Sequence, residues 1–139
     1  MANAIYPTYK TSIMSAGTDT SLILNTAQDG PFCSLVDTGV YTYNVAHQYF
    51  SPSLTGIVGT DQRIQSPTVV SGTFDGSDLT YVAVTGATVE ALVIYRHNAT
   101  ANTTWRLVCY LDTGVTGLPV TPNGGDITIT WDALGIFSL

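Results

Sequence analysis

Apolar residues along the chain occur in short runs rich in β-branched and aromatic side chains, separated by Gly, Pro, Asn and Asp. Almost nothing repeats at helical spacing. The runs predict eight short strands, near residues 21–25, 32–37, 55–60, 68–74, 79–85, 88–96, 104–111 and 126–131. Eight short strands joined by turns predict an all-β chain, folded as a single antiparallel β-sandwich or barrel.

The predicted strands differ in how many of their faces are apolar. In residues 126–131, Ile and Trp alternate with Thr and Asp, which is typical of a strand with one buried and one solvated face. Residues 88–96 and 104–111 are apolar on both faces, apart from the charged residues Glu90, Arg96 and Arg106. These two strands therefore belong in the middle of a sheet.

Helical candidates are few and short. One is Ile5–Met14, interrupted early by Pro7, and the other is Asn44–Phe50. Neither is long enough to carry a core, so both are predicted to lie at the surface. The expected organisation is one domain, with an N-terminal arm or short helix in residues 1–16 and the β-sandwich in residues 17–139.

Charged residues make up only 10% of the 139 residues, and ten acidic against four basic side chains give a net charge of −6. A phosphate backbone or an anionic bilayer attracts a cluster of cations. The sequence holds no such cluster, so neither nucleic acid nor a membrane is expected as a partner. It also lacks an apolar run typical of a signal peptide or a membrane span, and a soluble protein is expected.

The phrase Asp-Thr-Gly occurs twice behind apolar residues, at 37–39 and at 112–114. Aspartic proteases carry their catalytic aspartates in this motif and need two of them sharing one proton. The chain is too short for two protease lobes, and a dimeric protease would leave the second copy unexplained. The favoured interpretation is a turn in which Asp bonds the backbone two residues on and Gly is left-handed.

Other reactive residues show no catalytic or metal-binding spacing. His47, His97, Cys33 and Cys109 form no pair at ligand spacing, and no Ser lies in a nucleophile motif, so no metal, cofactor or enzymatic activity is expected. Both cysteines lie in apolar strand-like runs. Two buried free thiols are favoured over a disulfide, which stays open as the alternative.

Several aromatic and apolar residues cluster near the N-terminus and in the segment GVYTYNVAHQYFSPS. Flat rings on a weakly charged loop can anchor a protein contact or stack on sugar. Equally, they can cover one open end of the sandwich. The candidate partner contacts are Ile5, Tyr6, Tyr9, Tyr41, Tyr43, Tyr49 and Phe50.

Four segments that together span most of the chain carry a resemblance to known proteins. They are MANAIYPTYK, LVDTGVYTYNVAHQYFS, GTFDGSDLTYVAVTGATVEALVIYR and RLVCYLDTGVTGLPVTPNGGDITITWDALGIFSL. In these segments the chain resembles small virion structural proteins of tailed bacteriophages. The resemblance implies a jelly-roll-like sandwich of the cement or decoration type, placed on the capsid exterior and made in the bacterial cytoplasm.

Three functions follow as hypotheses. The first is a non-enzymatic decoration protein that binds the major capsid protein and other copies of itself, and stabilises the shell. The second is a tail or fibre component whose Tyr-rich loop and HNATANTT loop contact a host receptor or glycan. The third is a small dimeric aspartic protease acting through Asp37.

Overall fold

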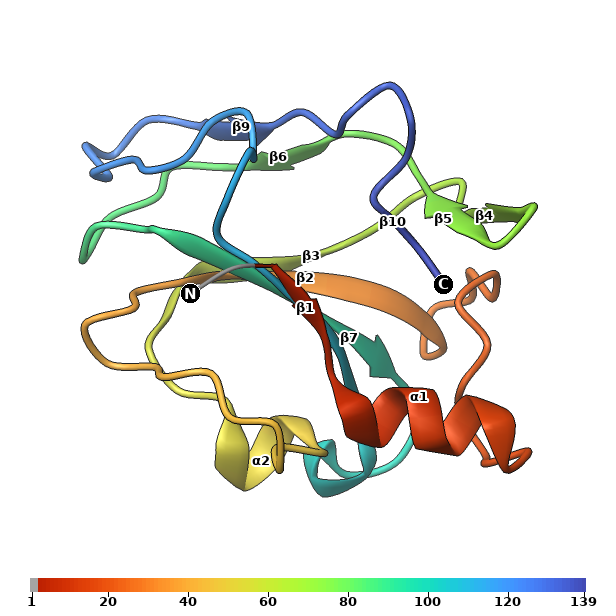
Figure 1. Cartoon of the computed structure of the whole chain (residues 1–139). Coiled ribbons are helices and arrows are strands. Elements are labelled where there is room, and N and C mark those ends of the chain that lie inside the picture. Colours follow the sequence, from red (N-terminus) through yellow and green to blue (C-terminus); the bar gives the residue numbers. More distant parts are fainter. Residues whose placement is uncertain (1–2) are drawn as a thin grey trace.

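The computed structural model describes residues 3–139 of the chain, which form mostly antiparallel strands (Figure 1). The elements in chain order are β1 (Ala4–Ile5), α1 (Pro7–Met14), β2 (Gly30–Val36), α2 (Phe50–Ser53), β3 (Ile57–Arg63), β4 (Thr68–Val70), β5 (Thr73–Asp75), β6 (Leu79–Tyr81), β7 (Ala91–His97), the 3₁₀ turn η1 (Asn102–Thr104), β8 (Arg106–Leu111), β9 (Ile127–Ile129) and β10 (Phe137–Ser138).

Five strands form the main sheet, in the order β1-β8-β7-β2-β3. Two small sheets, β10-β5-β4 and β6-β9, lie above it in Figure 1, and the two helices lie below it. The all-β class and the antiparallel sandwich are thus confirmed. The strand order does not establish a jelly roll, which stays a prediction.

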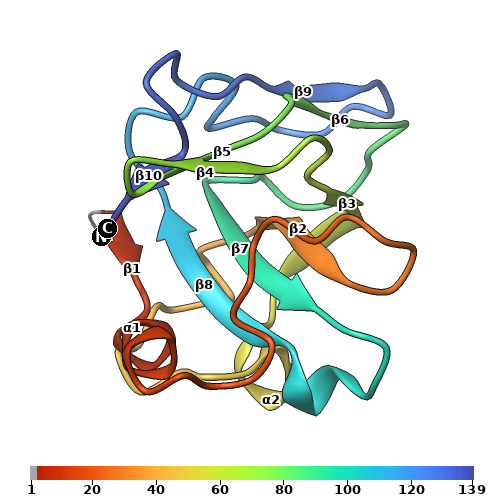
Figure 2. The same cartoon turned by 90° about the vertical axis from the view of Figure 1, so that its right-hand side faces the viewer.

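The middle of the main sheet is buried on both faces. Every residue of β8 from Leu107 to Leu111 is buried, as is every residue of β7 from Ala91 to Arg96. The small sheets cover one face and the helices with their loops cover the other (Figure 2). The prediction that these two strands lie in the middle of a sheet is confirmed. In β9 the predicted alternation also holds, since Ile127 and Ile129 are buried and Thr128 is exposed.

Two predicted strands differ in the structure. The run at 68–74 is a hairpin of β4 and β5, because Ser71 and Gly72 both take positive φ and turn the chain back. The run at 21–25 is not a strand. Its backbone is held to the sheet by the Arg96 side chain, which binds the carbonyl of Ser21, and not by a ladder of backbone hydrogen bonds.

These arginines explain how the long connection between α1 and β2 is ordered. Arg96, almost fully buried, donates from Nε to the carbonyl of Ser21 at 2.6 Å and lies 3.3 Å from the Asp29 carboxylate. Arg106 donates to the carbonyl of Thr18 at 2.7 Å. Arg63 donates to the carbonyls of Asp29 and Ala27, both at 2.9 Å. Three of the four basic side chains therefore bind the protein's own backbone.

The helix predictions are partly wrong. Pro7 does not interrupt a helix but begins one, since proline is well tolerated in the first turn, where its missing N–H is not needed. Residues 44–49 are not helical, and only Phe50 of the predicted range belongs to a helix, as the first residue of α2. The Asn44 carboxamide accepts a hydrogen bond from the backbone N–H of Ala46 at 2.8 Å, which forms a turn, and only the short α2 follows.

The N-terminal segment is part of the main body. β1 pairs with β8, with Ile5 opposite Cys109, and both Tyr6 and Tyr9 belong to the hydrophobic core. The residues 3–16 are therefore integrated into the fold and are not a free arm.

The two cysteines are free and buried, as predicted. Cys33 on β2 and Cys109 on β8 are both opposite Ile94 of β7, which lies between them. Two strand spacings separate them by roughly 9–10 Å, beyond the reach of a disulfide. Burial raises the pKa of the Cys33 thiol to about 12, so it is unreactive at neutral pH.

Candidate binding surfaces

The first Asp-Thr-Gly motif forms the predicted turn. The Asp37 carboxylate accepts a hydrogen bond from the backbone N–H of Gly39 at 2.7 Å, and its carbonyl accepts those of Val40 and Tyr41. Gly39, however, is not left-handed, because the Asp37 side chain and carbonyl already close the turn. Asp37 lies with Val40 and residues 56–59 in a shallow depression.

The second motif is a different turn. Asn3 accepts hydrogen bonds from the backbone N–H groups of Asp112 and Thr113 at 2.7 and 2.9 Å, and Gly114 has a φ of +71°. Here the predicted left-handed glycine is present. Asp112 lines a depression that does not include Asp37. The two aspartates thus hold separate turns and do not line a common site.

Three of the seven candidate contact residues are not exposed. Tyr6, Tyr9 and Tyr41 are buried, so the expectation that they contact a partner directly is wrong. Their hydroxyls have internal partners: Tyr6 and Tyr41 are 2.7 Å apart, and Tyr9 donates to the carbonyl of Thr20. These three tyrosines belong to segments next to loops, around α1 and in residues 40–47. Both segments lie across the main sheet, so the tyrosine rings pack into the hydrophobic core.

The other four candidates are half-buried. Ile5 lies in β1 against the core. The guanidinium carbon of Arg106 lies over the Tyr49 ring, 5.5 Å from its centre. Phe50 packs edge-on against Tyr95 and Trp105. Tyr43 lines a pocket.

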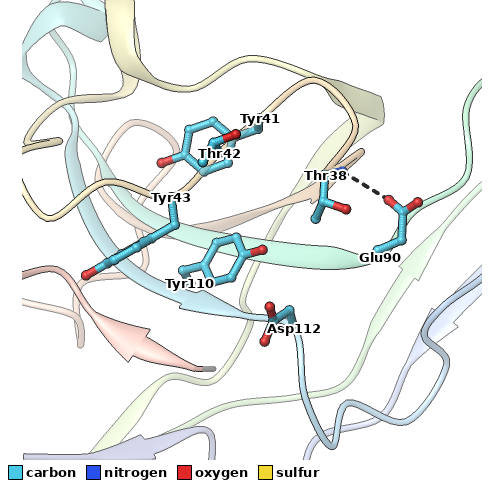
Figure 3. Close-up of a pocket in the computed structure, with 7 residues that line it drawn as sticks. All are labelled: Thr38, Tyr41, Thr42, Tyr43, Glu90, Tyr110 and Asp112. Atoms are coloured by element: carbon cyan, nitrogen blue, oxygen red, sulfur yellow. Dashed lines mark hydrogen bonds between the residues drawn. The ribbon is translucent and has the colours of Figure 1, made fainter. Parts of the chain in front are cut away.

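That pocket, here called the tyrosine pocket, lies between the turn after β2 and the end of β8 and has a volume of about 290 Å³. Figure 3 shows Tyr43 and Tyr110 side by side, with Asp112 next to Tyr110 and Glu90 on the far side beyond Thr38. The residues that line it are Thr38, Tyr41, Thr42, Tyr43, Glu90, Tyr110 and Asp112.

Two acidic side chains, Glu90 and Asp112, are among the described residues that line the tyrosine pocket. Burial, followed by the charge of Asp112 and the hydrogen bond with it, raises the pKa of Tyr110 to about 12, and the charge of Glu90 adds to the shift.

A second surface, here called the apolar groove, lies between α1 and the β10-β5-β4 sheet. Tyr9, Leu22, Phe74 and Phe137 line a depression of about 270 Å³, which a smaller one beside Lys10 extends. Four exposed apolar side chains stand around the groove, namely Met14 (81% exposed), Ile23 (57%), Val69 (51%) and Leu139 (64%). Contiguous exposed apolar surface of this kind marks a site of contact.

Neither surface is evident from local sequence patterns. The apolar groove combines side chains near residues 14, 23, 69 and 139, which come together only through the tertiary fold. A signal for the tyrosine pocket did exist, since Tyr43 was a candidate and the motif at 112–114 carries one of its carboxylates. Glu90 was noted only as a charged residue in an apolar strand.

The loop HNATANTT is largely occupied with internal contacts. Asn98 is buried, donates to the Asp19 carboxylate at 3.0 Å and accepts from the backbone N–H of Thr100 at 2.9 Å. The Trp105 indole N–H donates to the carbonyls of Asn98 and Thr100. This leaves the tip of the loop, around the exposed Asn102, as its accessible part.

Comparison with known proteins adds no family or relative. No protein-family model matches the chain, and no curated protein is significantly similar to it. Within residues 3–139, no helix is long and apolar enough to span a bilayer, and no three His, Cys, Asp or Glu side chains are grouped as metal ligands.

Proposed function

We propose that the protein is a non-enzymatic virion component of a tailed bacteriophage, a decoration protein that binds the outer surface of the capsid shell and stabilises it. The apolar groove is the observation that carries this proposal. A protein that works by adhesion needs exposed apolar surface, and here four such side chains surround one groove. The segments that resemble phage virion proteins support the same assignment.

The distribution of charge supports a position outside the shell. Three arginines bind the connection between α1 and β2, so the acidic side chains dominate what the protein presents to a partner. Packaged DNA repels such a surface. The partners proposed are the major capsid protein and neighbouring copies of this chain, because many modest contacts repeated over a symmetric lattice give strong attachment.

The proposal is tested first by location and copy number. Purified, salt-washed particles are expected to carry the protein in about as many copies as decoration sites on the shell, measured by quantitative mass spectrometry. Particles made without it are expected to release DNA at lower temperature, and added protein is expected to restore them. A protein absent from washed particles contradicts the proposal.

Groove variants test the surface itself. Val69→Asp and Leu139→Asp place a charge on the groove without disturbing the core, and each is expected to weaken binding to undecorated capsids about tenfold or more. Val82→Asp and Leu134→Asp are matched controls, since these side chains are at least as exposed as those of Val69 and Leu139 but lie outside the groove. Controls that weaken binding as much as the groove variants would place the contact elsewhere.

A tail or fibre component is the second candidate, and the tyrosine pocket favours it, because tyrosine rings beside carboxylates also suit a host glycan. Copy number separates the two functions. A tail component occurs in few copies per particle, and its loss abolishes adsorption to the host while leaving capsid stability unchanged.

A further inference from the structure

We propose that strand β4 pairs edge to edge with β4 of a second copy of this chain and so joins two molecules into a symmetric dimer. The partner is the protein itself, bound through an open sheet edge. The inference rests on the proposed function only for its setting, in which copies lie side by side on a shell. The pairing itself rests on the geometry of the β4-β5 hairpin.

β4 is the outer strand of the β10-β5-β4 sheet, and within residues 3–139 no strand pairs with its other side. All three of its residues, Thr68 to Val70, are exposed. Figure 1 shows the hairpin of β4 and β5 at the right-hand margin of the fold. An exposed strand edge of this kind offers backbone N–H and C=O groups to a further strand.

The hairpin geometry shows which backbone groups point outward. A two-residue turn joins β4 and β5, so the residues that flank it, Val70 and Thr73, bond each other directly. Because bonding alternates along an antiparallel pair, the next residue, Val69, directs its N–H and C=O to the open side. Phe74, opposite Val69, agrees with this alternation, since its carbonyl accepts from the N–H of Ile136 on the other side of β5.

Pairing about Val69 is self-complementary. A twofold axis at this residue sets the N–H of each copy against the C=O of the other, which gives two hydrogen bonds across the axis. Thr68 then faces Val70 of the second copy, and β-branched side chains stabilise such cross-strand pairs. Pro67, which has no N–H, and the turn at Gly72 limit the paired stretch to these three residues.

The charge distribution lets two copies meet at this edge. Each chain carries a net charge of −6, so copies generally repel one another. Residues 64–74, IQSPTVVSGTF, hold no charged side chain. A symmetric contact places each residue near its own counterpart, and centred on β4 it brings no like charges together.

The apolar groove enlarges the contact. Stable interfaces bury roughly 800 Å² per partner, more than three strand residues supply. The side chains of Val69 and Phe74 share one face of the hairpin, and both line the groove. Ile23 and Leu139, both more than half exposed, line the same groove. Pairing about Val69 therefore brings the grooves of two copies together beneath one sheet of six strands.

The other sheet edges of residues 3–139 are short, covered or blocked. β3 ends the main sheet, but its pairing with β2 is irregular around Gly59, and its Asp61 side chain turns inward to the Tyr95 hydroxyl. Bulges and inward-pointing charges protect an edge strand from further pairing. β1 and β10 have only two residues each, and β6 and β9 expose only their middle residue. These differences single out β4.

Sedimentation velocity over about 1–300 µM protein tests for the dimer, and a monomer–dimer equilibrium is expected. Added NaCl is expected to strengthen the association, because it screens the repulsion between two negative molecules whose contact is uncharged. A protein that stays monomeric over this range at high salt overturns the inference.

Val69→Pro tests the backbone bonds. It removes the outward N–H and no bond to β5, and proline is tolerated where a strand's N–H faces solvent. The dissociation constant of the dimer is expected to rise about tenfold or more. Val69→Ala, which keeps the N–H, is the matched control and is expected to raise it less. Strand pairing is refuted if Val69→Pro dimerises like the unmodified protein, or as well as Val69→Ala does.

Cross-linking locates the symmetry axis and decides the matter if Val69→Pro does not fold. The Cα atoms of a directly bonded antiparallel pair lie about 5.5 Å apart, so a short bismaleimide is expected to join Val69→Cys chains. Val82→Cys, exposed and outside the groove, is the control, and the native Cys33 and Cys109 are buried. Equal cross-linking of the two variants overturns the proposed pairing.

The same measurements on particles distinguish this inference from the proposed function. If the protein decorates washed particles but neither dimerises nor cross-links through position 69, strand pairing fails and the decoration function stands. If it dimerises through β4 in solution but is absent from particles, the pairing stands and the decoration function fails.

Discussion

A short chain of hydrogen bonds joins Tyr6, just before α1, to Tyr41 and His47 in the connection after β2. The Tyr6 and Tyr41 hydroxyls are 2.7 Å apart, and the Tyr41 hydroxyl lies 2.8 Å from Nδ1 of His47. With His47 neutral, Tyr6 donates to Tyr41 and Tyr41 donates to Nδ1, so both hydroxyl hydrogens have acceptors. A protonated His47 reverses both bonds, and in residues 3–139 the buried Tyr6 then has no acceptor for its hydrogen.

This chain predicts a pH dependence of stability. Burial lowers the pKa of His47 below its ordinary value of 6.5, so the unfolded state binds more protons than the folded state as the pH falls. The contribution of His47 to stability is therefore present above about pH 6.5 and is lost as the pH falls below it. Urea unfolding at pH 8 and pH 5.5 is expected to give the larger free energy of unfolding at pH 8.

Two variants isolate the cause. His47→Gln cannot take up a proton, so the difference in the free energy of unfolding between the two pH values is expected to shrink. Tyr6→Phe removes one hydroxyl from the chain and is expected to cost about 1–2 kcal/mol at pH 8. A pH dependence that is identical in His47→Gln and in the unmodified protein contradicts this account.

At the scale of elements, the irregular strand β3 shows how backbone geometry buries a charge. The register between β2 and β3 shifts between two of their residue pairs, since Cys33 is paired with Gln62 and Leu35 with Val58. The stretch of β3 between these pairs is longer than the matching stretch of β2, which makes a β-bulge on β3. Gly59, with a φ of +73°, lies in this bulge. The bulge turns Asp61 toward Tyr95, whose hydroxyl donates to Oδ2 at 2.8 Å, and leaves Oδ1 buried.

We expect Asp61→Asn to stabilise the protein near neutral pH. Burial raises the pKa of Asp61, although the hydrogen bond from Tyr95 opposes the shift, so the carboxylate destabilises the fold increasingly as the pH rises through its folded pKa. Asn still accepts from Tyr95 and carries no charge. Its free energy of unfolding is expected to exceed that of the unmodified protein by about 1 kcal/mol at pH 7, with little difference at pH 4.

Urea unfolding of Asp61→Asn across this pH range measures the effect, and Asp132→Asn, at an exposed carboxylate, is the control. If Asp61→Asn instead unfolds with a smaller free energy than the unmodified protein, and the deficit grows as the pH rises, that result contradicts the argument. It would indicate that the charge is retained for a purpose that the contacts of the folded chain do not reveal.

Sequence patterns predicted the regular elements well and the irregular ones poorly. Runs apolar on both faces identified β7 and β8 correctly, because burial on both sides leaves no polar alternation. The run at 21–25 looked like a strand because it is apolar, but nothing local reveals that arginines from β7 and β8 bind the connection containing it. Likewise, aromatic residues beside loops looked exposed, and only tertiary packing buries Tyr6 and Tyr41.

The whole molecule depends on its N-terminal segment. Tyr6 and Tyr9 belong to the hydrophobic core, β1 extends the main sheet beside β8, and Arg106 donates to Ser12 Oγ at 2.9 Å. The floor of the apolar groove also includes Tyr9. The segment, predicted from the sequence to be an arm or a short helix, thus supports both the core and a binding surface.

Deletion of residues 1–16 is therefore expected to abolish cooperative folding. Loss of a large buried aromatic side chain costs about 3–5 kcal/mol, so losing Tyr6 and Tyr9 together approaches the roughly 5–15 kcal/mol that stabilise a domain. Near-ultraviolet circular dichroism and urea titration are expected to show lost tertiary packing and a broad transition. The control is Met14→Ser in the full chain, whose side chain is 81% exposed and whose folding is expected to be unchanged. A truncated chain that unfolds in one sharp transition would mean that residues 17–139 form the folded unit by themselves, and that the segment serves binding alone.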